Sequence, residues 1–338
     1  MTGKEGLPLE EKKKRRSLFF RRYEKDGKGV KKEDVITDYT LGNFFKLYVR
    51  RFSKLVYVNF LYVFGNFPLL FFILGISGNF SNASVAPVSP LYPIAYGLYR
   101  ATGNSAATAP LFGLFGNMEP VFSHTTPACY VLFGISALFI ITFGLVNTGC
   151  AYLIKCMIKG DPIFLFEDFF HAIKQNWKQA VPLGILDLVF CGAGAYALSF
   201  YQSNYNTYYI LFFCTVAAFI VYTFMRFYLY NILVTFKVSF RQLIKNSFIL
   251  SILAIGKNFG ALLGILLFTG VSFLLFSVFM PFGVIILAML YFSTVSFIAT
   301  YAAYPKIKKY MIDPYYPAEN PDEPEEPEED EPVFRDHG

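Results

Sequence analysis

Two charged side chains, Asp187 and Arg226, stand inside otherwise uncharged apolar runs of this 338-residue chain. A charge within the hydrocarbon core of a membrane is costly, so each is a candidate functional residue by default. With a helical rise of ~1.5 Å per residue, the two residues lie at a similar depth on consecutive helices. We therefore predict that Asp187 and Arg226 form an ion pair.

Two hypotheses follow from this pair. In the first, the ion pair holds two helices together while the Arg226 side chain extends toward the membrane interface. In the second, the pair lines a path for a substrate or an ion. The positions of the residues leave both hypotheses open.

Four asparagines in the apolar runs add uncharged polar groups to this pair. Amide side chains inside a membrane usually form hydrogen bonds between helices. The alternative is a polar cavity in the cytoplasmic half of the membrane that the amides share with the ion pair. The candidate intramembrane polar cluster consists of Asp187, Arg226, Asn59, Asn66, Asn147 and Asn231.

Signatures of an enzyme are missing from the sequence. His124, His171 and His337 fall in separate segments, which argues against a shared metal site. The five cysteines show no CxxC spacing, and the chain has no phosphate-binding loop, nucleophile elbow or HExxH motif. We expect a protein that is not an enzyme and that carries no metal or cofactor.

The elements that position the polar residues are apolar runs long enough to cross a membrane. The chain is 55% hydrophobic and 16% charged, and a helical span needs ~20 apolar residues. Six such runs are present, and breaks at Met280-Pro281 and at the polar stretch 202–206 separate neighbouring ones. The predicted spans are 55–76, 129–154, 181–201, 208–236, 259–280 and 282–304.

The distribution of basic residues predicts the orientation of these spans. Lys and Arg are retained on the cytoplasmic side of a membrane. If the N-terminus is inside, 28 of the 30 Lys and Arg residues lie in cytoplasmic segments, Arg100 lies outside and Arg226 lies in the membrane. We predict a multi-pass protein with both termini in the cytoplasm.

Charge also divides the chain into parts. Residues 1–34 form a basic tail and 313–338 an acidic, proline-rich tail, and both are expected to be disordered. Between them, 35–312 form the membrane domain, with 77–127 as a long extracellular loop. The basic tract 12–16 is expected to meet the lipid bilayer at anionic headgroups, and not nucleic acid.

A repeated amphipathic pattern precedes every second span, typical of a helix that lies along the membrane surface. Aligned on this pattern, the units 35–155, 161–236 and 237–304 resemble one another. We predict an all-α polytopic membrane protein with six transmembrane helices in three pseudo-repeated hairpins, each preceded by a cytoplasmic interfacial amphipathic helix. The aligned aromatic residues are Phe44, Phe169 and Phe240, followed eight residues later by Phe52, Trp177 and Phe248.

Two segments carry a resemblance to a known family. The run NFLYVFGNFP at 59–68, and 160–180 with DFF at 168–170 and NWKQA at 176–180, resemble the YesL-like family of bacterial integral membrane proteins, known mainly from Firmicutes. The resemblance covers roughly 40–305 outside the long loop. It implies a bacterial cell membrane location and an unassigned molecular function, and some family members are encoded beside carbohydrate uptake systems.

These observations predict a non-catalytic accessory or scaffold component of a membrane assembly. The resemblance suggests a membrane protein partner such as a sugar uptake system. The alternative is a small-solute transporter or channel, for which repeated hairpins are typical. Ion-coupled carriers usually contain more membrane-embedded carboxylates than the single Asp187, which favours the scaffold.

Overall fold

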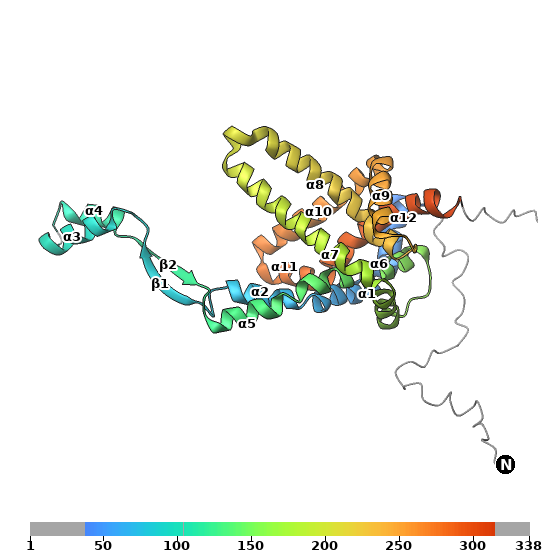
Figure 1. Cartoon of the computed structure of the whole chain (residues 1–338), viewed down its shortest axis with the longest axis horizontal. Coiled ribbons are helices and arrows are strands. Elements are labelled where there is room, and N and C mark those ends of the chain that lie inside the picture. Colours follow the sequence, from blue (N-terminus) through green and yellow to red (C-terminus); the bar gives the residue numbers. More distant parts are fainter. Residues whose placement is uncertain (1–37, 104, 315–338) are drawn as a thin grey trace, which may run out of the picture.

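The structure is a computed structural model that describes residues 38–103 and 105–314. The predicted basic tail lies outside the described residues, as does nearly all of the predicted acidic tail. The chain folds in the order α1 (Leu41–Gly65), α2 (Pro68–Ile76), β1 (Asn82–Pro87), α3 (Tyr92–Thr102), α4 (Thr108–Phe115), β2 (Met118–Ser123), α5 (Pro127–Ser136), α6 (Phe139–Lys159), α7 (Leu165–Ser203), α8 (Tyr205–Leu233), α9 (Phe240–Leu253), α10 (Ile255–Val278), α11 (Met280–Ile286), the π-helix η4 (Leu287–Tyr291), α12 (Phe292–Ile307) and the π-helix η5 (Lys308–Ile312) (Figure 1).

Long apolar helices dominate this architecture, as predicted for an all-α polytopic membrane protein. Among the described residues, five helices are long and apolar enough to cross a membrane, or six if the bent pair α1 and α2 counts as one span. Both predicted breaks are present, because Asn204 separates α7 from α8 and Phe279 separates α10 from α11. The strands β1 and β2 are the departure from an all-α fold.

The first apolar run is divided into two helices. α1 ends at Gly65, α2 begins at Pro68, and the two axes differ by 58°. Proline has no N–H to continue the hydrogen-bond ladder and its ring clashes with the preceding turn, so the bend falls at this residue. On the returning chain, Ala137 and Leu138 separate α5 from α6. Both residues keep right-handed helical dihedral angles, and Pro127–Lys159 continues as one helical span, so the sharp bend belongs to the first leg of the hairpin alone.

A helix separate from the span that follows it, as predicted for all three units, is present only in the third. There, α9 begins with a capping box at Ser239 and Gln242, and Ala254 separates it from α10. In the first two units the amphipathic stretch is the beginning of the long helices α1 and α7. Neither stretch is separated from its span by a residue that ends the helix. Pro182 lies near the junction in α7, but the helix continues through it.

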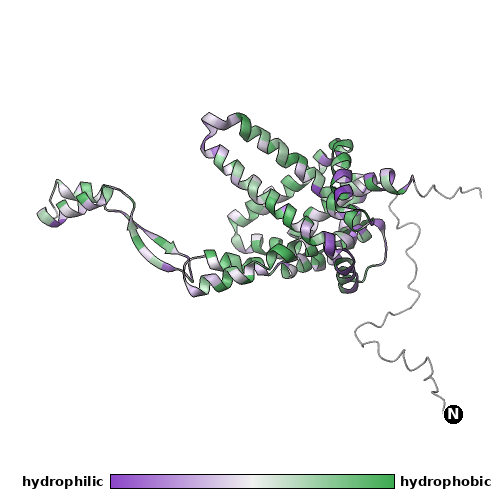
Figure 2. Cartoon of the chain, viewed as in Figure 1, coloured by the Kyte–Doolittle hydropathy of each residue, from purple (hydrophilic) through white to green (hydrophobic). Residues whose placement is uncertain are grey.

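The buried core gathers at one end of the molecule, which we call the basal end, where α1 begins and α12 ends (Figure 1). The last buried residue of α7 is Asp187, and the first of α8 is Tyr222. In α10 the buried residues are Asn258 and Ala261, both near its beginning. Beyond this level the hairpins diverge, and their apolar surfaces continue along the exposed lengths (Figure 2).

A close helix contact in this core joins α6 to α7. Gly144 and Gly184 face each other, and a Cβ atom added to either would overlap backbone atoms of the opposite helix. Small residues allow membrane helices to approach in this way, and the gain is van der Waals contact along both backbones. This contact holds the base of the α7–α8 hairpin against the first hairpin.

The long loop predicted at 77–127 forms an ordered arm. Strands β1 and β2 pair antiparallel over six residue pairs, from Asn82 opposite Ser123 to Pro87 opposite Met118. At the far end, α3 and α4 pack through aromatic rings, with the rings of Tyr99 and Phe112 4.7 Å apart. The arm projects from α2 and α5, away from the basal end (Figure 1).

Candidate functional site

Asp187 is the last buried residue of α7, and its carboxylate lies where the α7–α8 hairpin leaves the buried core. Its Oδ2 accepts hydrogen bonds from Arg226 Nε at 2.8 Å and from the Tyr230 hydroxyl at 3.1 Å. Its Oδ1 accepts one from the Tyr222 hydroxyl at 2.8 Å, and the Cys191 thiol lies 3.9 Å away. The predicted ion pair of Asp187 with Arg226 is therefore confirmed.

Helical spacing supplies these donors. Tyr222, Arg226 and Tyr230 are separated by four residues each, so their side chains leave α8 on one face. Cys191 stands four residues after Asp187 on α7, on the same face as the carboxylate. One face of α8 thus supplies three hydrogen-bond donors to Asp187 of α7.

Aromatic rings enclose the pair. The Tyr222 ring stacks on that of Phe190 at a centroid distance of 3.8 Å. The Arg226 guanidinium carbon lies 5.8 Å from the centroid of the Phe143 ring on α6. The Arg226 side chain is 38% exposed and the Asp187 side chain 1%, so the guanidinium is the accessible part of the pair.

The arrangement favours a structural role for Asp187. A carboxylate has about four lone-pair sites, and four donors surround this one. To bind a ligand or a proton, Asp187 would have to give up a contact with its present partners. Removing either partner of a buried ion pair leaves an uncompensated charge, which is strongly destabilising.

Asn59 lies fully buried in a different contact, between α1 and the π-helix η4. Its Nδ2 donates to the carbonyl oxygens of Leu287 at 3.0 Å and Ala288 at 2.7 Å, and its Oδ1 accepts from the Ser293 N–H at 3.0 Å. A π-helix disrupts the regular i to i−4 ladder. Asn59 therefore supplies hydrogen-bond partners to backbone groups of the last helix that lie in its apolar part.

Asn231 makes the second amide contact between helices. Its Nδ2 donates to the carbonyl of Phe227 at 2.7 Å and to the Thr300 hydroxyl of α12 at 3.3 Å. Its Oδ1 is buried and has no hydrogen-bond partner among the described residues. Asn231 therefore connects α8 to α12 with one polar atom left unpaired.

Asn66 and Asn147 bond to their own helices instead. Asn66 Nδ2 donates to the Tyr62 carbonyl at 3.0 Å, and Asn147 Nδ2 donates to the Phe143 carbonyl at 2.8 Å. The predicted hydrogen bonds between helices are thus found for Asn59 and Asn231. The six residues of the predicted cluster divide into the Asp187–Arg226 pair and several separate amide contacts.

Sequence reasoning missed the two tyrosines of the Asp187 site and the π-helix. Tyr222 and Tyr230 could have been found, because each stands four residues from Arg226 on the same predicted helix. The π-helix η4 has no comparable signal, since its sequence LAMLY is an ordinary apolar segment. The partners of Asn59 were therefore not predictable from spacing.

Within the described part of the chain, no three His, Cys, Asp or Glu residues gather in a group that could hold a metal ion. Comparison of the chain with protein-family models, with curated proteins and with solved structures finds no match. The resemblance to the YesL-like family consequently stays a prediction from the residues at 59–68 and 160–180.

Proposed function

We propose that this protein is a non-catalytic scaffold component of a membrane assembly and that it contacts its partner through the arm. The observation that supports this most is the apolar surface at the tip of the arm. Ile94 on α3 and Leu114 on α4 are each 70% exposed. Exposed apolar surface on a segment outside the membrane marks a site of interaction with another molecule.

Charge supports the same role. Between residues 77 and 127 the only charged side chains are Arg100 and Glu119. The fully buried part of a protein interface is depleted in charged residues and enriched in aromatic ones. The arm has this composition, and its tyrosines at 92, 96 and 99 give the tip a fixed aromatic face.

The internal contacts of Asp187 are consistent with a scaffold. Its carboxylate is occupied by Arg226 and two tyrosines, so the single acidic residue at this depth acts as a fastening for the α7–α8 hairpin. A carrier coupled to protons or cations needs a carboxylate that can change its partner. The Asp187 contacts therefore favour assembly over transport.

For the membrane arrangement, we propose that α1 and α2 together form one broken span. The chain then crosses the bilayer six times in three hairpins, with the basal end in the cytoplasm and the arm outside. The equivalent residues Phe52, Trp177 and Phe248 are all partly exposed near the basal end, which supports the pseudo-repeat. The family resemblance adds a bacterial cell membrane and a sugar uptake system as the first partner to test.

The test is copurification from native membranes in mild detergent. We expect a partner in fixed ratio with the wild-type chain and its loss with Ile94→Glu and Leu114→Glu together. Ser84→Glu, an exposed position on β1, is the matched control and should retain the partner. Repeated isolation of the wild-type chain without a partner would contradict the proposal.

One observation favours a transporter as the second candidate. The Oδ1 atoms of Asn66 and Asn231 are buried without a partner among the described residues, as expected of groups that meet water or a solute. Solute flux and ion conductance in vesicles reconstituted with the purified chain test this candidate. Flux that Asn231→Leu abolishes while the fold is retained would favour the transporter.

A further inference from the structure

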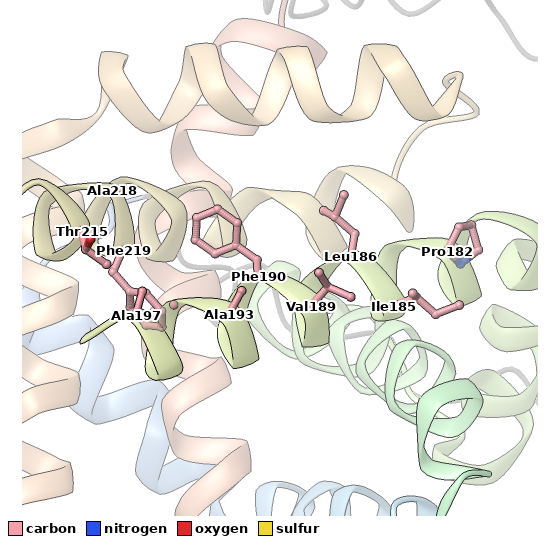
Figure 3. Close-up of a pocket in the computed structure, with 11 residues that line it drawn as sticks. Pro182, Ile185, Leu186, Val189, Phe190, Ala193, Ala197, Thr215, Ala218 and Phe219 are labelled. Carbon is pink, nitrogen blue, oxygen red and sulfur yellow. The ribbon is translucent and has the colours of Figure 1, made fainter. Parts of the chain in front are cut away.

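An apolar groove runs along the α7–α8 hairpin (Figure 3). Residues of α7 line it at intervals of three and four from Pro182 to Ala197, and α8 contributes Thr215, Ala218 and Phe219. The Thr215 hydroxyl donates to the Leu211 carbonyl of its own helix, so it is already paired. The lining side chains therefore present an apolar surface to whatever occupies the groove.

The groove is long enough for one hydrocarbon chain. From Pro182 to Ala197 it is about 22 Å long at ~1.5 Å per residue. Its volume is about 680 Å³. Because the lining offers an apolar surface, an apolar chain can lie along it without leaving a polar group unpaired.

A positively charged side chain stands one helical turn before the basal end of the groove. Lys178 precedes Pro182 by one helical turn on the same face of α7, and it has no acidic partner within the described residues. Pro182 has no N–H, so the Lys178 carbonyl lacks its usual helical partner. The Lys178 ammonium lies 5.9 Å from the ring of Trp177, which is exposed. Tryptophan beside lysine is typical of the headgroup level of a membrane.

We propose that this groove binds an anionic phospholipid of the surrounding bilayer, with one acyl chain between Pro182 and Ala197 and the phosphate at Lys178. In the orientation proposed above, the cytoplasmic leaflet at this end carries anionic lipid. The Lys178 ammonium has no acidic partner within the described residues, so charge complementarity selects the occupant. The apolar lining holds the chain, and the lysine distinguishes anionic from zwitterionic headgroups.

The single tryptophan of the chain, Trp177, is next to Lys178 and reports on lipid near that residue. The purified protein is placed in bilayers that contain phosphatidylglycerol or phosphatidylcholine, each with a nitroxide label near the start of one acyl chain. The proposal predicts that labelled phosphatidylglycerol quenches Trp177 fluorescence with about fivefold higher apparent affinity, which is the effect of one lysine near an anionic headgroup.

Two variants and two controls separate the parts of the site. Lys178→Gln is expected to abolish the preference for phosphatidylglycerol, and Ala193→Phe, which fills the groove, is expected to weaken quenching by both lipids. Lys309→Gln, a lysine on a different helix, and Ala195→Phe, an exposed α7 residue outside the groove lining, should leave both quantities unchanged. Size-exclusion chromatography checks that each variant is folded.

Equal quenching by the two lipids in the wild-type chain would overturn the proposal, as would a preference that survives Lys178→Gln. A dimer in detergent that Ala193→Phe disrupts, without a lipid preference, would assign the groove to a second copy of the chain instead. Failure of the partner test at the arm leaves this result unaffected, because the groove and the arm belong to different hairpins.

Discussion

Asp187 on α7 and Arg226 on α8 form an ion pair of 2.8 Å at the level where the packed basal core ends. Below this level, helices from all three hairpins share buried side chains, and above it α7 and α8 bury none. The pair therefore marks the level at which α7 and α8 leave the packed core, beyond which they contact each other through rings such as Phe190 and Phe219. Its loss should affect the hairpin before it affects the rest of the core.

Asp187→Asn is expected to destabilise the protein. The substitution keeps the shape of the side chain and removes the charge that compensates Arg226. Breaking one partner of a buried pair costs ~3–5 kcal/mol, and the partial exposure of the guanidinium places the expected loss at the lower end of that range. Thermal unfolding in detergent measures it.

The control for this prediction is Asp161→Asn. Asp161 pairs with Lys159 at 3.2 Å on the surface, where both side chains are substantially exposed. An exposed pair contributes ~0–1 kcal/mol. If both variants shift the unfolding temperature equally, the Asp187 contact does not fasten the hairpin.

Gly184→Val should prevent the close packing of α7 on α6. The new side chain would overlap the backbone at Gly144, which has no side chain to move aside. We expect little folded protein, measured as the monodisperse fraction on size exclusion. Gly192→Val is the matched control, since nothing lies within 4 Å of a Cβ at that position. Normal folding of Gly184→Val would show that the two helices can separate.

Asn59→Leu removes three hydrogen bonds to the last helix. Hydrogen bonds between membrane helices contribute ~0.6 kcal/mol each on average, so the expected loss is about 2 kcal/mol. Hydrogen exchange should also become faster at the backbone of η4 and at Ser293. Asn147→Leu loses only a bond within its own helix and should have a smaller effect. Unchanged exchange at η4 would mean that the π-helix does not depend on Asn59.

The features that the sequence predicts well are those that depend on composition and on spacing along one helix. The apolar runs predict the long helices, and Pro281 and the polar residues around Asn204 predict two of the turns. The pairing of Asp187 with Arg226 follows from their similar depth on consecutive helices. In each case, the feature lies within one helix or between two consecutive helices.

Features that depend on contacts between distant segments were not predictable. The Asn59 partners lie more than 200 positions away, on a π-helix with no local signal. The beginnings of α1 and α7 have the amphipathic pattern of interfacial helices, but no helix-ending residue separates them from the spans that follow. Pattern alone does not distinguish a separate helix from the first turns of a longer one.

The proposed orientation predicts which side of the membrane each end of the molecule faces. In a background without the five native cysteines, Ala106→Cys on the arm should react with a membrane-impermeant maleimide in intact cells. Lys309→Cys at the basal end should react only after permeabilisation. The reverse pattern would invert the topology. Reaction of both sites in intact cells would mean an even number of crossings between them, which contradicts the five that the proposed topology places there.

A photo-crosslinking residue at Ile94 tests the central claim, that the tip of the arm binds a partner. In native membranes, irradiation should give one adduct of defined mass, and the same residue at Ser84 should give none. Leu114 should give the same adduct, because it belongs to the same exposed tip. Absence of a protein adduct at both tip positions, with the chain folded and correctly inserted, would contradict the scaffold function.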